Sequence, residues 1–599
     1  MKHIKCIIIA FCILLPLNVF SQIKPDYSSF AKIYGFVRYY SPNPYTANWD
    51  DYDWGRVCGY LIYQYANGNE SLPSVFLPLA PDYTISTTPQ EGLFVNKAPS
   101  DTTYCWRYIG GGSIEIADHV KQKYPEIANY KPYYKELVVS QKDTPVPDSI
   151  YSYEISDNLW LNMPHALSKS RFSKIQTEQL LETSKKYWKQ FEDIMIWREI
   201  KSSEFPDEVL KPFMVALLSS SIEKWNAIEH FYPYYDDDNL LWHNKLQPLL
   251  DATLKSSNID KHFYSLNYAA SSLNDGHFTI VPIVEMSKDK FLPYGRQYLP
   301  LSVDYVENNA IITAISPELT TKLKKYDIIT SIDGVITDSI ISQRKHYIST
   351  GTNDCIPIKA LNEFLRTCDY KKPYIFTVKR GSEIITDTVI TSMVYPYFES
   401  KTDSTITIID KKILIFRATN SEADYAYFLS NIDKFKKAKK IIFDVRGYPH
   451  YDFMNILSHF STSPIQLPKF VKKVSCLPNR KFSRKNITQD SVECSTPFIN
   501  KEVLFLANHS TQSWGETVMM SVKYNKIGKI IGSRTSGTNG DITYFNHPVY
   551  RMIVTGMQTF YPDGSQFHGV GVVPDIEVKP SIDGFTNGKD EVLEKAIKY

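Results

Sequence analysis

The chain has 599 residues, of which 43% are hydrophobic and 22% are charged, the composition of a globular protein. Its 67 Lys and Arg and 65 Asp and Glu residues give a formal charge of +2, and the absence of any long run of like charge excludes a nucleic-acid-binding arm and an acidic tail. At roughly 100–200 residues per domain the length predicts three to five domains, and an aromatic content of 14% excludes a disordered chain.

Residues 1–21 have the pattern of a secretory signal peptide. Lys2 and Lys5 form a basic start, and an almost wholly apolar run extends over Cys6–Leu17. The alternative is an uncleaved anchor helix, but the run is short for the ~20 residues that span a bilayer and Pro16 interrupts it. We therefore expect export to the periplasm or the cell surface. The mature chain would have equal numbers of acidic and basic residues and no transmembrane segment.

The next two segments differ in pattern. Residues 22–150 are rich in Tyr, Trp, Pro and Gly, which predicts an accessory domain of mixed, β-rich structure. Residues 151–296 are largely helical in pattern, because apolar residues recur at three- and four-residue spacing in Glu178–Ile200 and Asp207–His230. This helical region ends in a strand that starts beside His277.

The C-terminal half contains two further segments. Residues 297–393 alternate strands and turns, which predicts a β-rich domain. Residues 394–599 alternate short apolar strands with helices, the pattern of an α/β domain. Its predicted strands are Lys412–Arg417, Lys440–Val445, Glu502–Leu506 and Lys529–Ile531.

The cysteines predict no metal site. Six remain after the signal peptide, they lie far apart in the sequence, and none forms a Cys-x-x-Cys pair. In an exported chain, Cys355 with Cys368 and Cys476 with Cys494 are the candidate disulfides.

Ser513 follows an apolar strand and begins an apolar-periodic helix. Ser513-Trp514-Gly515-Glu516 matches the capping box Ser-x-x-Glu, so one interpretation is purely structural. The other interpretation is catalytic. Backbone N–H groups and the positive end of the helix dipole lie at a helix N-terminus, where they stabilise the oxyanion formed in acyl transfer.

A nucleophilic serine needs a base and an oxyanion hole. The best base is His277, which the Asp275-Gly276 turn presents at a strand start. Phe443–Gly447 reads as a buried strand that ends in a glycine, whose N–H can approach a substrate carbonyl. Each feature has a plain structural alternative, a histidine in a turn and an Asp–Arg pair at a strand end.

The motifs occur in a definite order along the chain. Asp-Gly-His, the β-rich segment, Asp-x-Arg-Gly and Ser-x-x-Glu are followed by Gly-x-x-Thr-x-Gly at 532–537 and Gly-Val-Val-Pro-Asp at 571–575. This succession resembles the tail-specific, or C-terminal-processing, serine peptidase family from about residue 270 to the end. The resemblance implies a multidomain α/β protein with a crotonase-like (ClpP-like) catalytic core in 394–599 and a PDZ-like domain in 297–393.

The resemblance also assigns roles to residues. It implies Ser513 as the nucleophile, with Gly447 and the backbone N–H of Trp514 as the oxyanion hole. One branch of the family has a Lys base at the position of Thr538, so this chain is similar to the other branch, which includes the tricorn core and uses the histidine, here His277.

Two positions depart from the family pattern. A Glu normally precedes the Gly-Val-x-Pro-Asp motif and orients the histidine, whereas this chain has no acid in Gln566–Gly569. Glu516, Gln566 and His568 are therefore the candidate orienting residues, alongside a more distant carboxylate or none at all. The usual Asn-Pro-Gly-Gly after Arg-Gly is replaced by Tyr448–Tyr451, a bulkier loop that we expect to reshape the substrate cleft.

The function implied is that of an exported serine endopeptidase acting on peptides or proteins, with neither a metal nor an organic cofactor and with no nucleic-acid partner. PDZ domains add an extended peptide to a sheet edge, and the resemblance places Leu299, Leu301 and Val303 on that edge as substrate-binding residues. Two alternatives are a catalytically weak or inactive PDZ-containing peptide-binding scaffold and an esterase for small acyl groups. The sequence predicts no oligomeric state.

Overall fold

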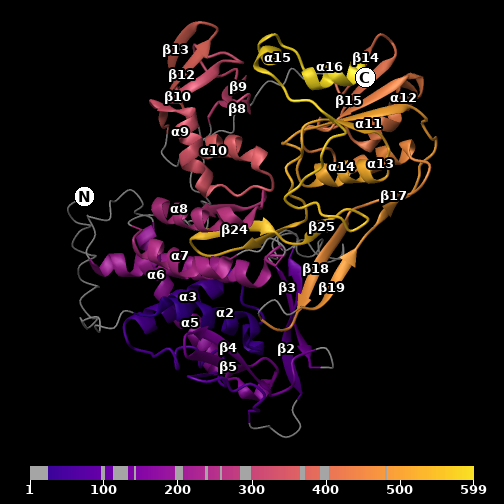
Figure 1. The fold of residues 1–599 in the computed structure, drawn as a ribbon. Coiled ribbons are helices and arrows are strands. Elements are labelled where there is room, and N and C mark those ends of the chain that lie inside the picture. The colour runs from indigo at the N-terminus through magenta and orange to yellow at the C-terminus, as the bar shows by residue number, and fades with distance from the viewer. Residues whose placement is uncertain are drawn as a thin grey trace. The chain divides into compact units, whose positions relative to one another are not determined.

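The computed structural model describes residues 25–95, 102–111, 133–140, 144–195, 207–236, 241–256, 259–282, 299–364, 371–391, 404–478 and 482–599. The predicted signal peptide lies outside these residues. The chain divides into two compact units, one of residues 1–106 and 137–226, the other of residues 107–136 and 227–599. Figure 1 colours the elements in chain order. No helix in the described part of the chain is long and apolar enough to cross a membrane.

The first unit combines helices with a small antiparallel sheet in the order β1-β5-β4. The strands of this sheet are β1 (Thr84–Ser86), β4 (Ile150–Ser156) and β5 (Leu159–Pro164), while the short β6 (Leu167–Ser168) lies outside it. The helices are α2 (Tyr27–Tyr40), α3 (Asp51–Ala66), α5 (Lys174–Met195) and most of α6 (Asp207–Phe231). The expected β-rich N-terminal segment thus begins with two long helices, because its aromatic residues lie at helical spacing and are buried along α2.

Buried charge ties these helices together. Arg38 of α2 is 2% exposed and forms ion pairs with Asp51 of α3, at 2.7 Å, and with Glu223 of α6. Burying an unpaired charge costs several kcal/mol, so a buried arginine needs such partners. The aromatic segment of α2 is therefore a structural element of this unit.

The second unit contains the strand next to His277. The helices α7 (Leu246–Leu254) and α8 (Ile259–Ala270) lead into β7 (Thr279–Pro282). This strand pairs with β24 (Tyr550–Thr555), which pairs in turn with β23 (Ile542–Phe545). The predicted strand at His277 therefore exists, and its partner strands come from the C-terminal region of the chain.

An inserted antiparallel sheet follows β7 in the sequence. Its strand order is β13-β12-β10-β9-β8, with β11 on β10, so β8 is an edge strand. The strands are β8 (Leu301–Val306), β9 (Asn309–Ile315), β10 (Ile328–Ile332), β11 (Val335–Ile336), β12 (Pro373–Arg380) and β13 (Glu383–Ile390). Two helices accompany it, α9 (Thr337–Arg344) and α10 (Ile356–Phe364), and α10 packs against β8. We call residues 299–391 the insert.

The C-terminal α/β region is built on a mostly parallel sheet in the order β14-β15-β16-β21-β22-β26, in which only β14 is antiparallel to its neighbour. The strands are β14 (Ile406–Ile409), β15 (Ile413–Arg417), β16 (Lys440–Asp444), β21 (Glu502–Ala507), β22 (Lys529–Gly532) and β26 (Ile576–Glu577). All four strands predicted for this region are present. The protein is thus a multidomain α/β protein with mixed sheets.

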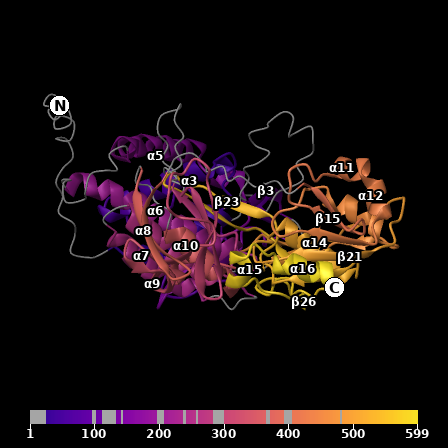
Figure 2. The same cartoon turned by 90° about the horizontal axis from the view of Figure 1, so that it is seen from above.

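Helices cover both faces of this sheet. Phe443 and Phe505 point into a core shared with α14 (Trp514–Tyr524), whereas Ile442 and Leu504 point to the face that packs on α16 (Glu591–Lys598). Figure 2 shows α16 beside β21. The first face also carries α11 (Tyr425–Ser430), α12 (Ile432–Lys437) and α13 (Phe453–Leu457).

The remaining elements are short strands and one helix. They are β2 (Thr103–Gly111), β3 (Tyr133–Val139), β17 (Ile465–Gln466), β18 (Lys469–Ser475), β19 (Phe482–Thr488), β20 (Ser491–Val492), β25 (Gln558–Phe560) and α15 (Ile582–Thr586). Cys355, Cys476 and Cys494 are free thiols. The expected Cys476–Cys494 disulfide is therefore absent, and the other candidate pair, Cys355 with Cys368, includes a residue that lies outside the described ones.

Candidate active site

Ser513 lies at the carboxyl edge of the parallel sheet, where α/β proteins bind ligands. The loop after β21 leads to it, and α14 begins at the next residue. Its backbone has φ 55° and ψ −116°, a strained region for a residue other than glycine. Hydrogen bonds hold this conformation: the Ser513 N–H donates to the Thr538 carbonyl at 3.0 Å and to the Glu516 carboxylate at 3.1 Å.

Glu516 connects Ser513 to the loop after β22. Its fully buried carboxylate also accepts hydrogen bonds from the Thr535 hydroxyl at 2.5 Å and from the N–H groups of Gly537 and Thr538 at 2.6 and 3.1 Å. Burial raises the pKa of Glu516 to about 8, although these hydrogen bonds oppose the rise. The predicted capping glutamate thus has a wider role than capping, since it fixes Ser513 relative to residues 535–538.

His277 is oriented by a threonine and an aspartate. The Thr555 hydroxyl lies 2.9 Å from His277 Nδ1 and donates to Asp275 Oδ1 at 2.7 Å, while the Thr555 N–H donates to Asp275 Oδ2 at 2.7 Å. Because the hydroxyl proton is directed at the carboxylate, the hydroxyl oxygen accepts from Nδ1–H. That hydrogen bond assigns the tautomer in which Nε2 carries the lone pair needed by a general base.

Burial also keeps the histidine neutral. Desolvation lowers the pKa of His277, and Lys359 and His568 lower it further, whereas Asp275 and Asp541 oppose the shift. A neutral imidazole can accept the proton of a serine hydroxyl. Its environment therefore suits a base at neutral pH.

Thr538 contacts both Ser513 and the turn that precedes His277. Its carbonyl accepts from Ser513 N–H, and its hydroxyl accepts from the Gly276 N–H at 2.9 Å. A Cβ on Gly276 would lie only 2.7 Å from that hydroxyl, so the close approach requires a glycine there. In the described chain no hydrogen bond joins the Ser513 and His277 side chains, a contact that often tightens only when substrate binds.

The insert supports the histidine turn from the other side. Lys359 of α10 donates to the Gly276 carbonyl at 2.9 Å, and the Asp275 N–H donates to the Ser349 hydroxyl at 2.9 Å. Gly351 approaches residues 537–538 so closely that a Cβ there would lie 2.4 Å from Thr538 Oγ1. Residues far apart in the sequence thus meet at His277.

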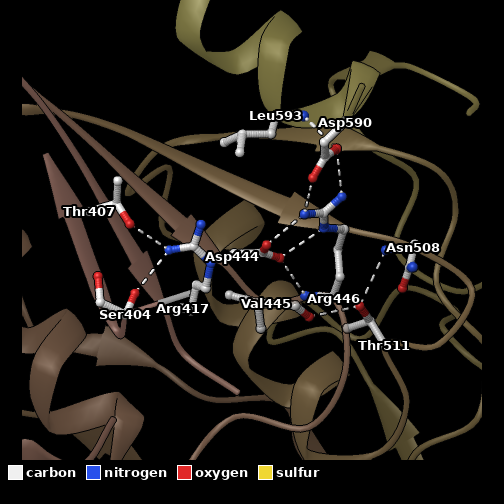
Figure 3. A network of polar contacts seen from close by, with 10 residues as sticks. All are labelled: Ser404, Thr407, Arg417, Asp444, Val445, Arg446, Asn508, Thr511, Asp590 and Leu593. Atoms are coloured by element: carbon white, nitrogen blue, oxygen red, sulfur yellow. Dashed lines mark hydrogen bonds and ion pairs between the residues drawn. The ribbon is translucent and has the colours of Figure 1, made fainter. Parts of the chain in front are cut away.

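The strand end before Gly447 is fixed by an arginine with two carboxylate partners, as Figure 3 shows. The Arg446 guanidinium donates to Asp444 at 2.9 and 2.6 Å and to Asp590 at 2.9 and 2.6 Å. Asp590 caps α16, because its carboxylate accepts from the Leu593 N–H at 3.0 Å. The C-terminal helix is thereby attached to the loop that holds Gly447.

The two predicted oxyanion donors differ in availability. The Trp514 N–H is at the first position of α14 and has no partner within the helix. The Gly447 N–H donates to the Val445 carbonyl at 2.9 Å. Of the two, only the Trp514 amide is ready to bind an oxyanion.

This geometry agrees with a family match. The model of peptidase family S41 matches residues 406–578. The chain carries a peptidase family S41 domain. The protein is accordingly a serine peptidase, a hydrolase, and its substrates are peptides or proteins. The matched residues include Ser513 and Glu516 but neither His277 nor Asp590.

Several solved structures are also similar to the chain. Mature CPAF complexed with lactacystin is 12% identical with a TM-score of 0.50, covering 64% of this chain and 97% of that one, a likeness of fold alone. The photosystem II D1 C-terminal processing protease is 14% identical with a TM-score of 0.35, and the match covers 62% of this chain and 97% of that one. A putative peptidase from Parabacteroides merdae ATCC 43184 is 15% identical with a TM-score of 0.37, and the match covers 63% of this chain and 94% of that one. No curated protein matches the chain.

The other predicted orienting residues make no hydrogen bond to His277. Gln566 donates from Nε2 to the His568 carbonyl at 3.1 Å. The His568 ring stacks on Tyr234 at 3.6 Å between ring centroids, so it affects His277 through charge and makes no hydrogen bond to it. Glu516 contacts the nucleophile loop. None of these three residues hydrogen-bonds to His277.

The predicted substrate-binding residues belong to the edge of the insert. Leu301 and Val303 are on β8, while Leu299 comes just before it. Leu301 is 5% exposed and contributes to the core of the insert, and Leu299 and Val303 pack partly buried against that core. A peptide at this edge would contact the backbone of β8 more than these side chains.

Sequence reasoning missed several residues of the candidate site. Asp275 was visible beside His277 as part of a turn, but nothing in the sequence marked it as the acid. Thr555, Lys359 and Asp590 carry no local signal, since they reach the site only through folding. Among the described residues, no group of three or more His, Cys, Asp or Glu side chains is arranged to hold a metal ion.

Proposed function

We propose that the protein is an exported serine endopeptidase in which Ser513 and His277 cleave peptide bonds through an acyl-enzyme. The observation that carries the proposal is the chain of contacts from Asp275 through Thr555 to His277 Nδ1. It supplies the orienting acid that the sequence lacks at the expected position. The export half of the proposal rests on the signal-peptide pattern of residues 1–21.

In the proposed mechanism, Ser513 Oγ attacks the carbonyl carbon of the scissile peptide while His277 Nε2 takes its proton. The carbonyl electrons move onto oxygen, and the Trp514 N–H at the start of α14 stabilises that negative charge. The imidazolium is stabilised through Thr555 and Asp275. Collapse of the intermediate breaks the C–N bond, and the leaving amine takes the proton from His277.

Deacylation follows the same steps in reverse. His277 removes a proton from a water molecule, the hydroxide adds to the ester carbonyl, and the proton returns to Ser513 Oγ as the C–O bond breaks. A carboxylic acid product is released and the enzyme is regenerated. Every proton moves between Ser513, His277, water and substrate, so these steps require no further co-reactant.

We further propose that the catalytic core is crotonase-like and that the insert is PDZ-like. The support is the position of β8 at a sheet edge with α10 packed against it, the arrangement in which an extended peptide can add a strand. The insert would then hold part of a substrate chain close to the histidine turn that Lys359 contacts.

A fluorophosphonate probe tests the function directly. The wild-type protein should be labelled at one site, Ser513→Ala should abolish labelling, and His277→Ala should slow it by orders of magnitude. A folded wild-type protein that remains unlabelled, and cleaves neither casein nor unfolded peptides, would favour the inactive peptide-binding scaffold. Cell fractionation with N-terminal sequencing tests export, with Gln22 as the expected first residue of the mature chain.

A further inference from the structure

The turn that presents His277 depends on a hydrogen bond from the insert. Asn274 has φ 52° and ψ 36°, the left-handed conformation, and ends the short helix before it. The next N–H group, that of Asp275, donates to the Ser349 hydroxyl at 2.9 Å. Asp275 is fully buried and Ser349 is 5% exposed, so water does not replace this acceptor. The backbone of the turn is thus fixed by a side chain of the insert.

Asp275 in turn fixes the base. Its carboxylate accepts from the hydroxyl and from the N–H of Thr555, each at 2.7 Å, and from the His277 N–H at 2.9 Å. These bonds set the side chain, whereas the bond to Ser349 sets the backbone from which that side chain extends. A shift of Asp275 at its N–H therefore moves the carboxylate away from the Thr555 hydroxyl on which the orientation of His277 depends.

The segment that carries Ser349 has contacts on two sides. On one side Gly351 approaches the loop after β22, where a Cβ on it would lie 2.4 Å from Thr538 Oγ1. On the other side Lys359 Nζ donates to the Gly276 carbonyl at 2.9 Å and to the Ser349 carbonyl at 3.4 Å. Because both sides are in contact, the Ser349 hydroxyl has a defined place beside the turn.

We propose that Ser349 is a positioning residue of the peptidase, which fixes Asp275 and thereby orients His277 through Thr555. This inference rests on the proposed function and adds to it a residue from the insert. Ser349 acts through Asp275 alone, touches no reacting atom and exchanges no proton with the base. The insert is then part of the catalytic centre, in addition to any peptide that it binds.

Ser349→Ala removes the acceptor and leaves a buried N–H without a partner. The folded variant should show a kcat lowered about 10–100-fold with KM within about twofold, since small misplacements of catalytic groups are costly in the chemical step. Labelling by the fluorophosphonate should slow to a similar degree. A contact that only stabilises the fold would lower the melting temperature and leave kcat of the folded protein unchanged. The control is Ser342→Ala, at an exposed position of α9 in the same insert.

Two further variants separate the hydrogen bond from the packing. Ser349→Cys keeps the size of the side chain but accepts hydrogen bonds weakly, so its kcat should also fall, and it serves in place of Ser349→Ala if that variant does not fold. Ser349→Thr keeps the hydroxyl and should retain at least about half of kcat. Ser349→Ala combined with Thr555→Val should be little worse than Thr555→Val alone, because both residues act on His277 as one unit.

Three results overturn the inference. The first is a folded Ser349→Ala or Ser349→Cys variant whose kcat stays within about twofold of wild type. The second is a loss in Ser349→Thr as large as that in Ser349→Ala, because threonine keeps the hydroxyl. The third is a double variant whose loss is the product of the two single losses. Failure of the proposed function is separate from these results, since it appears as a folded wild-type protein that the probe does not label.

Discussion

The two halves of the active site are built in opposite ways. Around Ser513 the partners are near in sequence: Glu516, Thr535 and Thr538 all come from the same helix and the next loop. Around His277 the partners are remote: Thr555 is 278 residues away and Lys359 supports the turn from the insert. The surroundings of Ser513 thus form from segments close together in the sequence. The surroundings of His277 form only when distant segments have folded together.

This contrast explains how much of the site is readable from the sequence. Ser513 lies in a capping motif after an apolar strand, so both its position and its helix could be predicted. His277 could be identified from its turn, but its orienting partners could not. A threonine at the end of β24 looks like any strand residue, and its pairing with Asp275 depends on the register of β24 against β7.

The largest expected effect is on the histidine half. Asp275→Asn places an amide where the Thr555 hydroxyl and the His277 backbone N–H donate, which disturbs the tautomer of His277. By analogy with other triads, kcat should fall by about 10³–10⁴-fold. Thr555→Val should cost a comparable factor, and the double variant should be little worse than either single one because the residues act as a unit.

The matched control is Thr555→Ser, which keeps the hydroxyl and should retain most of kcat/KM. Steady-state cleavage of a fluorogenic peptide measures all four variants. Full activity of Thr555→Val would refute the orienting role, and so would a loss in Thr555→Ser as large as that in Thr555→Val, because serine keeps the hydroxyl.

The next effect concerns the nucleophile half and is one of stability. Burial raises the pKa of Glu516 from 4.5 to about 8, so the native state binds more protons than the unfolded state between these values. The contribution of this group to the free energy of unfolding therefore falls as pH rises from about 4.5 to about 8. Glu516→Gln should remove this pH dependence. It should also cost about 1–3 kcal/mol, because an amide cannot accept all the hydrogen bonds that reach the carboxylate.

Urea unfolding at several pH values measures this prediction. The control is Glu577→Gln, since Glu577 is 65% exposed and pairs with Lys579 at the surface. Equal pH slopes for wild type and Glu516→Gln would show that Glu516 does not titrate in this range.

A smaller effect is expected from the C-terminal helix. Although burial opposes it, Arg446 lowers the pKa of Asp590, which keeps that carboxylate charged and the arginine clamped. Asp590→Asn should loosen the loop of Gly447 and reduce kcat about tenfold, since small misplacements of catalytic groups are costly. Glu594→Gln, on the same helix but with a solvent-exposed ion pair to Lys598, should have no effect on kcat.

The fold could be predicted from the sequence more completely than the site, because its strands follow from local patterns whereas the site depends on contacts between distant segments. The four parallel strands that the sequence predicted in the C-terminal sheet are short apolar runs, and burial on both faces makes such runs visible in the sequence. The helices α2 and α3 were not predicted from the sequence, because their aromatic residues are as common in strands as on buried helix faces. The connection of Asp590 to Arg446 joins residues 144 positions apart, and no local pattern encodes it.

The smallest effect is expected at Lys359, whose side chain contacts the turn of His277. Desolvation, Lys359 and His568 lower the pKa of His277, while Asp275 and Asp541 raise it. Lys359→Met removes one lowering influence, so the pKa of His277 should rise. Because the base must be neutral, the acidic limb of the kcat/KM profile should move to higher pH, with little change on the plateau. Lys379→Met, at an exposed position of β12 in the same insert, is the control and should leave the profile in place. A shift toward lower pH, or none, would mean that Lys359 acts only as a structural contact and that the insert does not influence the chemistry of the base.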